Sequence, residues 1–299
     1  MLATRLLTAA ILGPVVLAAA YVGDPWLSVL LGLVVFLAMV ELIALLDAAG
    51  FEPPQVVGLL AGFAVGAAGL VTANATSIGG LLSDLLRTTA TPGLSLLVMV
   101  AAMLLLAVAS FTRSDPRAGF LSWASSSFGV AYVGLLVPLV AVVGHLGPVG
   151  GSAATDVGGL GIRAGAAWTL TLILLVWGYD TGAYLTGRWL GRHHLIDHIS
   201  PSKTVEGLVG GLILATLAAG LGTWLIGLQP WHALLLGPVI GMAAQAGDLA
   251  ESLVKRAAGR KESGFLIPGH GGILDRVDSF LFAAPVLVGY ALLLGGAMV

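Results

Sequence analysis

Long apolar segments, separated by short polar connections, recur from one end of the chain to the other. An α-helix needs about 20 mostly apolar residues to cross the hydrocarbon core of a bilayer. Nine segments approach or reach this length, at 6–22, 26–46, 56–73, 93–111, 128–147, 165–185, 207–227, 232–247 and 279–298. The pattern therefore predicts an all-α fold, a polytopic integral membrane helical bundle with about nine transmembrane helices. The segment at 232–247 ends in polar residues and is expected to continue as an amphipathic helix.

The composition supports a membrane protein and excludes several kinds of chemistry. Hydrophobic residues make up 58% of the chain and charged residues only 9%, with a mean hydropathy of +1.02. The chain has no cysteine, which excludes disulfides, thiolate metal sites and cysteine nucleophiles. Its 43 glycines suit close helix packing in lipid, or else reflect a general bias in composition. The first 25 residues are similar to a signal peptide, but further spans follow at once, so we expect an uncleaved first helix.

The basic residues predict the orientation of the helices, since Lys and Arg concentrate in cytoplasmic connections. With the N-terminus in the cytoplasm and nine spans, eleven basic residues fall on the cytoplasmic side and only two, Arg87 and Arg163, on the other. The eleven are Arg5, Arg113, Arg117, Arg188, Arg192, Lys203, Lys255, Arg256, Arg260, Lys261 and Arg276. This orientation places two charge-rich connections, at about 186–206 and 248–278, in the cytoplasm. We expect them to line one polar cavity that faces the cytoplasm.

All three lysines of the chain lie in these two connections. Charged side chains are costly inside a membrane, so a mostly apolar protein that collects its charges in one place is expected to use them for chemistry. We therefore predict an N-terminal transmembrane scaffold or lipid-facing region over 1–160. A C-terminal transmembrane region over 161–299 would carry the chemistry.

The stretch from Ser252 to Asp278 holds five basic residues, three acids and a histidine. Within it, the run from Pro268 to Gly272 contains three glycines, which predict a tight turn whose backbone N–H groups can approach a ligand closely. A helix that starts directly after this turn would point its positive end at an anion. The turn is therefore a candidate phosphate site.

Two carboxylates follow this turn, and Asp275 and Asp278, three positions apart, would share one face of the helix. Carboxylates without an obvious partner favour a cation, and oxygen ligands suit Mg²⁺. The neighbouring basic residues suit phosphate groups; they are Lys255, Arg256, Lys261 and Arg276. His270, flanked by glycines, is expected to act as a hydrogen-bond donor to a phosphate rather than as a metal ligand. The alternative is a charged loop satisfied by its own ion pairs.

A polar stripe is predicted just upstream, where Asp248, Ser252 and Lys255 follow one another at i, i+4 and i+7 of a helical pattern. Glu251 lies beside them. The simpler alternative is an amphipathic surface helix stabilised by pairing of Glu251 with Lys255. Both interpretations stay open on this segment alone.

A third polar segment lies at 177–211, and Asp180 within it is an acid inside an apolar run, which makes it a functional candidate by default. Ser200 followed by Pro201 predicts a helix N-cap with proline at the first helical position. The first turn would then hold Ser202, Lys203 and Thr204, and their hydroxyl and amino groups suit a phosphate. Ser200 has the simpler alternative role of capping alone.

Several common catalytic patterns do not occur in the chain. The histidines at 193, 194 and 198 lack a spacing that favours a metal site. The sequence has no Walker A pattern, no G-x-S-x-G and no H-E-x-x-H. These observations argue against a P-loop ATPase, a serine hydrolase and a zinc protease.

These polar segments together resemble the phosphatidate cytidylyltransferase family, the integral membrane CDP-diacylglycerol synthases. The family signature runs S-x-x-K-R, four residues, K-D, then P-x-H-G-G-x-x-D-R-x-D. The matching residues here are Ser252, Lys255, Arg256, Lys261, Glu262, Pro268, His270, Gly271, Gly272, Asp275, Arg276 and Asp278. Glu262 is the one departure, since it stands where the family has Asp. The resemblance is detailed over about 177–280 and extends more loosely to the plan of many spans.

The resemblance implies that CTP and phosphatidic acid react to give CDP-diacylglycerol and pyrophosphate in phospholipid biosynthesis, with Mg²⁺ required and an additional second cation left open. It implies a catalytic cavity facing the cytoplasm of a bacterial-type cell membrane. The implied metal carboxylates are Asp248, Asp275 and Asp278. The implied phosphate-binding side chains are Lys203, Lys255, Arg256, Lys261 and Arg276. Ser200, Ser202, Thr204, Ser252 and His270 would assist them, with Asp180 in the same polar region.

Two other functions remain open on the sequence. A CTP-dependent enzyme could act on a different lipid phosphate or on a lipid alcohol, because the apolar wall that selects the lipid carries no readable motif. An anion transporter could use the same cationic cavity, although no internal repeat favours it. The expected partners are the two substrates and the lipid bilayer, without nucleic acid, and a homodimer is left open.

Overall fold

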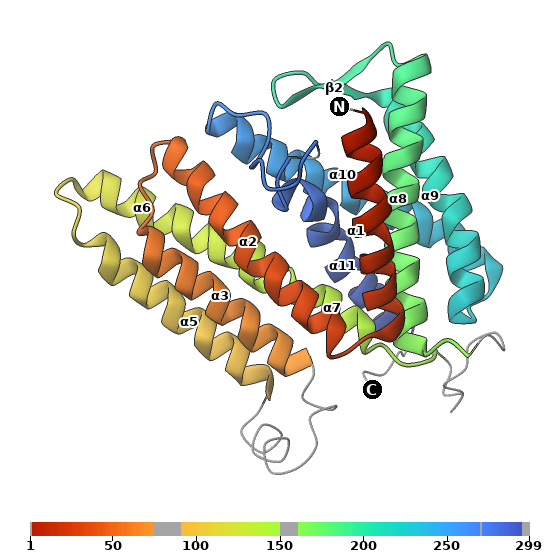
Figure 1. Ribbon diagram of the computed structural model, residues 1–299, viewed down its shortest axis with the longest axis horizontal. Coiled ribbons are helices and arrows are strands. Elements are labelled where there is room, and N and C mark those ends of the chain that lie inside the picture. The colour runs from red at the N-terminus through yellow and green to blue at the C-terminus, as the bar shows by residue number, and fades with distance from the viewer. Residues whose placement is uncertain (1, 74–90, 150–160, 270, 295–299) are drawn as a thin grey trace. The chain divides into compact units, whose positions relative to one another are not determined.

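The computed structural model describes residues 2–73, 91–149, 161–269 and 271–294, and nearly all of them are helical (Figure 1). The α-helices of the described residues are α1 (Leu2–Val22), α2 (Trp26–Ala48), α3 (Gln55–Ala73), α5 (Thr91–Ser110), α6 (Pro116–Gly129), α7 (Pro138–Gly144), α8 (Ala164–Leu190), α9 (Val205–Ile226), α10 (Ala233–Ala257) and α11 (Leu274–Leu293). A π-helix, η1 (Val130–Leu135), joins α6 to α7, and a 3₁₀-helix, η2 (Pro230–His232), precedes α10. Two short strands, β1 (His194–Ile196) and β2 (Ser200–Thr204), form a hairpin. Each of the nine predicted apolar segments overlaps helical structure, so the helical nature of the fold is confirmed.

Within the described residues, six helical segments are long and apolar enough to cross a membrane by length and composition. They are Trp26–Ala48, Gln55–Ala73, Pro116–Gly144, Val205–Ile226, Pro230–Ala257 and Leu274–Leu293. Two shorter apolar helices, Thr8–Val22 and Leu94–Ser110, accompany them. The chain is therefore an α-helical membrane protein.

The described chain divides into two compact units. Unit 1 comprises residues 1–12, 24–141 and 254–276, and unit 2 comprises 13–23, 142–253 and 277–299. The predicted division into 1–160 and 161–299 stays a prediction.

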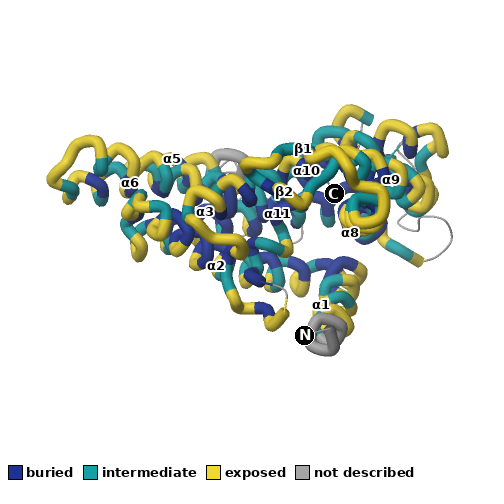
Figure 2. Tube along the Cα trace, turned by 90° about the horizontal axis from the view of Figure 1, so that it is seen from above, coloured by how far each residue is buried: buried dark blue, intermediate teal, exposed yellow. Residues whose placement is uncertain are grey.

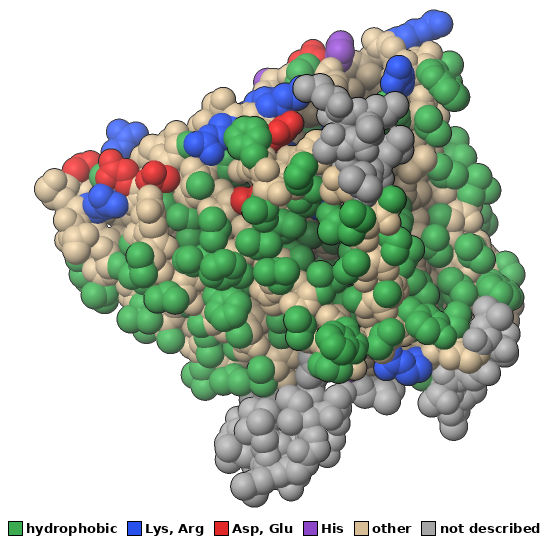
Figure 3. Space-filling model, in the orientation of Figure 1, with side chains coloured by type: hydrophobic (Ala, Val, Ile, Leu, Met, Phe, Trp, Pro, Cys, Tyr) green, Lys and Arg blue, Asp and Glu red, His purple; other side chains and the backbone are tan. Residues whose placement is uncertain are grey.

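In unit 1, helices α2, α3 and α5 lie side by side (Figure 1). Buried and exposed residues alternate along α2 and α3 at helical spacing (Figure 2). Met39 and Leu42 of α2 are buried, and Gly62 of α3 leaves the space that the Met39 side chain fills. Hydrophobic side chains cover much of the face that Figure 3 shows. The exposed hydrophobic residues of these three helices include Leu33, Phe36, Leu60, Phe63 and Leu104. An exposed apolar flank of this kind is expected to face lipid.

In unit 2, α8 and α9 pack closely through glycines. A β-carbon on Gly211 would lie 2.7 Å from the Tyr179 ring, and one on Gly182 would lie 2.5 Å from the Gly210 carbonyl oxygen. Gly241 of α10 packs against the same Tyr179 ring. Only glycine permits this close approach at these positions. Close helix packing, rather than a general bias in composition, therefore explains the glycines there.

The hairpin corrects one prediction from the sequence. Ser200 does not cap a helix, because residues from Ser200 to Thr204 pair as strand β2 with β1, and α9 begins only at Val205. Thr204 is the N-cap, and its hydroxyl accepts a hydrogen bond from Gly207 N at 3.1 Å. Glu206, in the first turn, accepts backbone hydrogen bonds from Arg192 and His193 and fastens the hairpin to the helix start. These tertiary bonds outweigh the local Ser-Pro signal.

Candidate active site

The predicted glycine turn before α11 is confirmed. Gly269 and Gly271 both have φ of +78°, a left-handed conformation that favours glycine. Ile267 N donates to Gly271 O at 2.9 Å and closes the turn. Helix α11 begins at Leu274, directly after it, as the sequence predicts. His270 lies outside the described residues.

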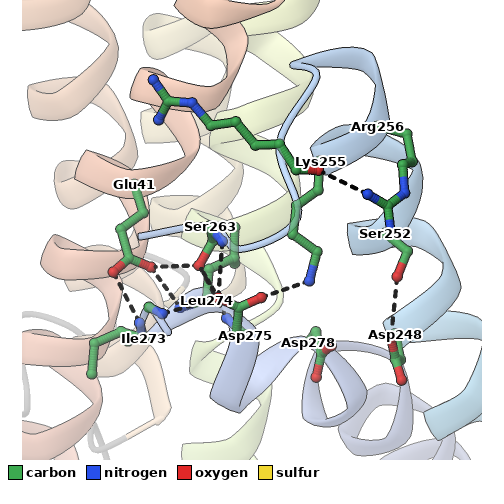
Figure 4. Close-up of polar contacts among 12 residues, drawn as sticks. Glu41, Asp248, Ser252, Lys255, Arg256, Ser263, Ile273, Leu274, Asp275 and Asp278 are labelled. Carbon is green, nitrogen blue, oxygen red and sulfur yellow. Dashed lines mark hydrogen bonds and ion pairs between the residues drawn. The ribbon is translucent and has the colours of Figure 1, made fainter. Parts of the chain in front are cut away.

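Asp275, in unit 1, has both carboxylate oxygens engaged (Figure 4). Its Oδ1 lies 2.6 Å from Lys255 Nζ. Its Oδ2 accepts hydrogen bonds from Ser263 N at 2.9 Å, Ser263 Oγ at 2.8 Å and Gly272 N at 2.9 Å. The side chains of Asp275 and Lys255 are only 7% and 11% exposed. The structure thus brings together the aspartate expected to bind a metal and the lysine expected to bind a phosphate.

Glu41 of α2, which the sequence analysis did not identify, contacts the same loop (Figure 4). Its carboxylate accepts hydrogen bonds from Ile273 N at 2.9 Å and Leu274 N at 2.8 Å. Its Oε2 also lies 3.0 Å from Ser263 Oγ, whose single hydroxyl proton is shared with Asp275 Oδ2. The residue is 8% exposed. An available signal was that Glu41 is an acid inside the apolar run 26–46, the criterion that selected Asp180. Three N–H groups at this helix start, those of Gly272, Ile273 and Leu274, are therefore bound by protein carboxylates.

The other charged side chains of this loop are exposed. Arg256 donates to the Arg260 carbonyl oxygen at 3.2 Å, and Lys261, Glu262 and Arg276 lie at the surface. Exposed cations suit the binding of an anionic ligand from solution. The replacement of the family aspartate by Glu262 thus falls at an exposed position.

Unit 2 holds a second ion pair, between Lys203 of β2 and Asp248 of α10. The side chains are 18% and 32% exposed, so this pair is more open than the one in unit 1. Ser252 Oγ donates to the other Asp248 oxygen at 3.3 Å (Figure 4). The stripe predicted on one helix is confirmed for Asp248 and Ser252.

The remaining predicted residues of unit 2 are distributed around this pair and on α8. Asp278 is 9% exposed, and its backbone carbonyl fills the space beside Gly247, so the segments carrying Asp248 and Asp278 are adjacent. Asp180 is exposed on α8, next to Tyr179, whose hydroxyl donates to Gln245 Oε1 at 2.5 Å. Ser200 is buried and Ser202 is exposed, both on the strand β2.

The fit of these residues to Mg²⁺ rests on Asp248 and Asp278. Among the residues that the structure describes, no three His, Cys, Asp or Glu side chains cluster as a complete metal site. Mg²⁺ is usually held by one or two carboxylates together with substrate phosphates and water. Asp248 and Asp278 lie on adjacent segments and supply two such carboxylates, although Asp248 already pairs with Lys203 and accepts a hydrogen bond from Ser252. Asp275 carries Lys255 on Oδ1 and three hydrogen-bond contacts on Oδ2.

Comparison with known proteins identifies the family. The profile of the Cytidylyltransferase family matches residues 3–294, and the chain therefore belongs to that family. The resemblance found in the signature residues is thus confirmed over nearly the whole length.

Curated relatives carry a more specific name. The chain is 48% identical over 128 residues to a phosphatidate cytidylyltransferase of Synechocystis sp., a match that covers 42% of this chain and 43% of the relative. It is 46% identical over 125 residues to the protein of that name from Staphylococcus haemolyticus, covering 41% and 48% of the two chains. A Staphylococcus aureus protein of the same name is 43% identical over 125 residues, with the same coverage. The matches span less than half the length of these relatives.

Proposed function

We propose that the protein is a phosphatidate cytidylyltransferase, which transfers CMP from CTP to phosphatidic acid and yields CDP-diacylglycerol and pyrophosphate. The observation that carries this proposal is the family signature, folded so that Lys255 and Asp275 form a buried ion pair in a chain of the Cytidylyltransferase family. The names of the relatives supply the lipid substrate.

The proposed reaction needs no nucleophile from the protein. An oxygen of the lipid phosphate attacks the α-phosphorus of CTP, the bond from this phosphorus to the bridging oxygen breaks, and pyrophosphate leaves with that oxygen. Catalysis then consists of positioning the two anions and stabilising the negative charge that moves to pyrophosphate. A chain without cysteine that is rich in lysine and arginine at its polar segments suits this chemistry.

The lysines have the leading role in this proposal. Lys203 and Lys255 are each held by an aspartate, so the two ammonium groups are oriented before a phosphate arrives. An ammonium carries three donors, so its bond to Asp248 does not exhaust Lys203. Further phosphate contacts are assigned to Arg256, Lys261, Arg276, Ser200, Ser202, Thr204, Ser252 and His270, with Asp180 beside them.

Mg²⁺ is part of the proposal and would be held by Asp248 and Asp278, with Asp275 as the third predicted carboxylate. Bound there, it would neutralise negative charge on the triphosphate. The role that the contacts support directly for Asp275 is to hold Lys255 and the loop at Ser263 and Gly272.

The finer membrane arrangement is also proposed. Nine spans with a cytoplasmic N-terminus would make a multi-pass protein of the cell membrane, with both charged connections on the cytoplasmic side. The bias of eleven basic residues against two supports this orientation.

The test uses purified protein in detergent micelles with phosphatidic acid, Mg²⁺ and CTP labelled on either the α- or the γ-phosphate. Cytidylyl transfer moves the α-label into the lipid fraction and releases the γ-label as pyrophosphate. Diacylglycerol, a lipid alcohol, serves as the control substrate. A lipid product that carries only the γ-label, or none with phosphatidic acid, would contradict the proposal.

A further inference from the structure

The carboxylate of Glu41 connects α2 to the loop that carries the family signature. Its partners lie 222–233 positions away in the sequence, and they are Ser263 Oγ, Ile273 N and Leu274 N. All of these groups belong to unit 1. A buried carboxylate therefore holds a distant segment in place through two backbone N–H groups and a contact with the Ser263 hydroxyl.

The hydrogen bonds that Glu41 accepts from the start of α11 are expected to be stronger than average. The first N–H groups of a helix have no partner within the helix, and a negative charge there is favoured by the helix dipole. Glu41 takes the N–H groups of Ile273 and Leu274, while Asp275 takes that of Gly272. Hydrogen bonds to an ionised carboxylate are stronger than neutral ones. The start of α11 is therefore fixed by two carboxylates, of which only Asp275 is local.

Ser263 links the two carboxylates. Its hydroxyl lies 3.0 Å from Glu41 Oε2 and 2.8 Å from Asp275 Oδ2. Asp275 in turn holds the Lys255 ammonium group at 2.6 Å. A shift of the Glu41 carboxylate would therefore reach Lys255 through Ser263 and Asp275.

Glu41 packs closely against two glycines of the loop. A β-carbon on Gly264 would lie 2.6 Å from Glu41 Oε1, and one on Gly272 would collide with both Glu41 oxygens and with Ser263 Oγ. The two glycines thus enclose the carboxylate on α2. Such close packing limits how far the loop can shift relative to α2 while Glu41 stays in place.

We propose that Glu41 is a positioning residue for nucleotide binding, which acts through Ser263 and Asp275 to place the ammonium group of Lys255 against a phosphate of CTP. The identity of the nucleotide in this inference rests on the proposed function. The positioning of the loop by Glu41 rests on the hydrogen bonds alone. Loss of Glu41 should leave the loop in its binding-competent position in only a fraction of molecules. The apparent affinity for the nucleotide then falls by that fraction, and saturating nucleotide restores the rate.

The main variant is Glu41→Gln, which keeps the shape but replaces one acceptor oxygen by an N–H₂ group that faces backbone donors. The matched control is Glu52→Gln, the same change in unit 1 at a residue whose carboxylate pairs with Arg113 at 2.7 Å instead of with the loop. Ser263→Ala is a second, smaller change, which breaks the link to Asp275 and leaves the bonds from Glu41 to Ile273 and Leu274 intact.

Two measurements on the intact chain test the inference. In Glu41→Gln, we expect the Michaelis constant for CTP to rise about fivefold or more, with kcat and the constant for phosphatidic acid changed by less than about twofold. Ser263→Ala should show the same separation, and Glu52→Gln should match the unaltered protein. Hydrogen exchange at the amides of Ile273 and Leu274 should be about tenfold faster in Glu41→Gln but unchanged in the control.

The outcomes separate the two proposals. If Glu41→Gln and Ser263→Ala lower only the maximal rate, in proportion to the folded protein, Glu41 is a structural anchor and the inference is wrong. Unchanged exchange at Ile273 and Leu274 in Glu41→Gln would also overturn it. If the unaltered protein turns over no CTP while the exchange rates respond as expected, the proposed function fails and the positioning of the loop stands.

Discussion

Lys255 Nζ lies 2.6 Å from Asp275 Oδ1, and each side chain is almost fully buried. The two residues lie 20 positions apart, on α10 and at the start of α11. From the sequence alone, Lys255 was expected to bind a phosphate and Asp275 a metal ion. Because each now has the other as a partner, a change at one of them alters the charge and the position of the other.

Breaking this pair should cost both stability and turnover. Removing one partner of a buried ion pair typically costs about 3–5 kcal/mol, because the remaining charge has no partner. We expect Asp275→Asn and Lys255→Met each to lower the free energy of unfolding by about this amount and to abolish turnover. The double variant should be less destabilised than the sum of the single variants, as measured by thermal unfolding in detergent. Additive losses would show that the pair is not coupled.

Lys203 is expected to be needed for turnover but not for folding. Its pair with Asp248 is partly exposed, so losing it should change stability little. Loss of a charged phosphate contact should lower turnover about tenfold or more in Lys203→Ala. Arg117→Ala, which removes an exposed cation of unit 1, is the control and should keep full activity. Equal activity of both variants would contradict the assigned role of Lys203.

The corrected start of α9 can be tested directly. Thr204→Ala removes the side-chain cap and should cost about 1 kcal/mol, whereas Thr204→Ser keeps the hydroxyl and should cost much less. Ser200→Ala should leave α9 intact, because Ser200 lies on strand β2. Thermal unfolding of the three variants gives the comparison. A larger loss for Ser200→Ala than for Thr204→Ala would restore the original interpretation of Ser200 as the cap.

The glycines of α9 should differ sharply in their tolerance of alanine. A β-carbon on Gly211 would overlap the Tyr179 ring, and overpacking of this kind costs about 1–3 kcal/mol. Gly220 has open space around its β-carbon position, so Gly220→Ala should be neutral or stabilise the helix by up to about 1 kcal/mol. The melting temperatures of Gly211→Ala and Gly220→Ala measure the difference. Similar melting temperatures would argue against close packing of α8 on α9.

The nine-span topology predicts opposite locations for two reporter fusions. A reporter placed after Val299 should lie outside the cytoplasm, and one in the connection 186–206 should lie inside it. Two reporters that are active on opposite sides of the membrane, such as a phosphatase and a fluorescent protein, measure the location of each fusion. If both fusions report the same compartment, the count of spans is wrong by one.

Much of the fold follows from local sequence. Runs of apolar residues predict helices because every backbone polar group in lipid must be satisfied within the segment. The turn at Gly269 and Gly271 and the helix start at Leu274 depend on conformations that a few neighbouring residues determine, and both were predicted correctly. The Ser-Pro signal at Ser200 failed, because the pairing with β1 and the bonds from Glu206 lie outside that local window.

Apolar runs and signature residues were enough to predict a helical membrane protein that resembles the cytidylyltransferases, with Lys203, Asp248, Lys255 and Asp275 among its functional candidates. The pairing of these residues, and the bonds from the signature loop to Glu41, became known from the packed structure. Glu41 reaches its partners across 222–233 positions, and no periodicity or turn chemistry carries information over that distance. Side-chain hydrogen bonds are made only at about 3 Å, so the partner of a buried charge is decided by which segments the packing brings together.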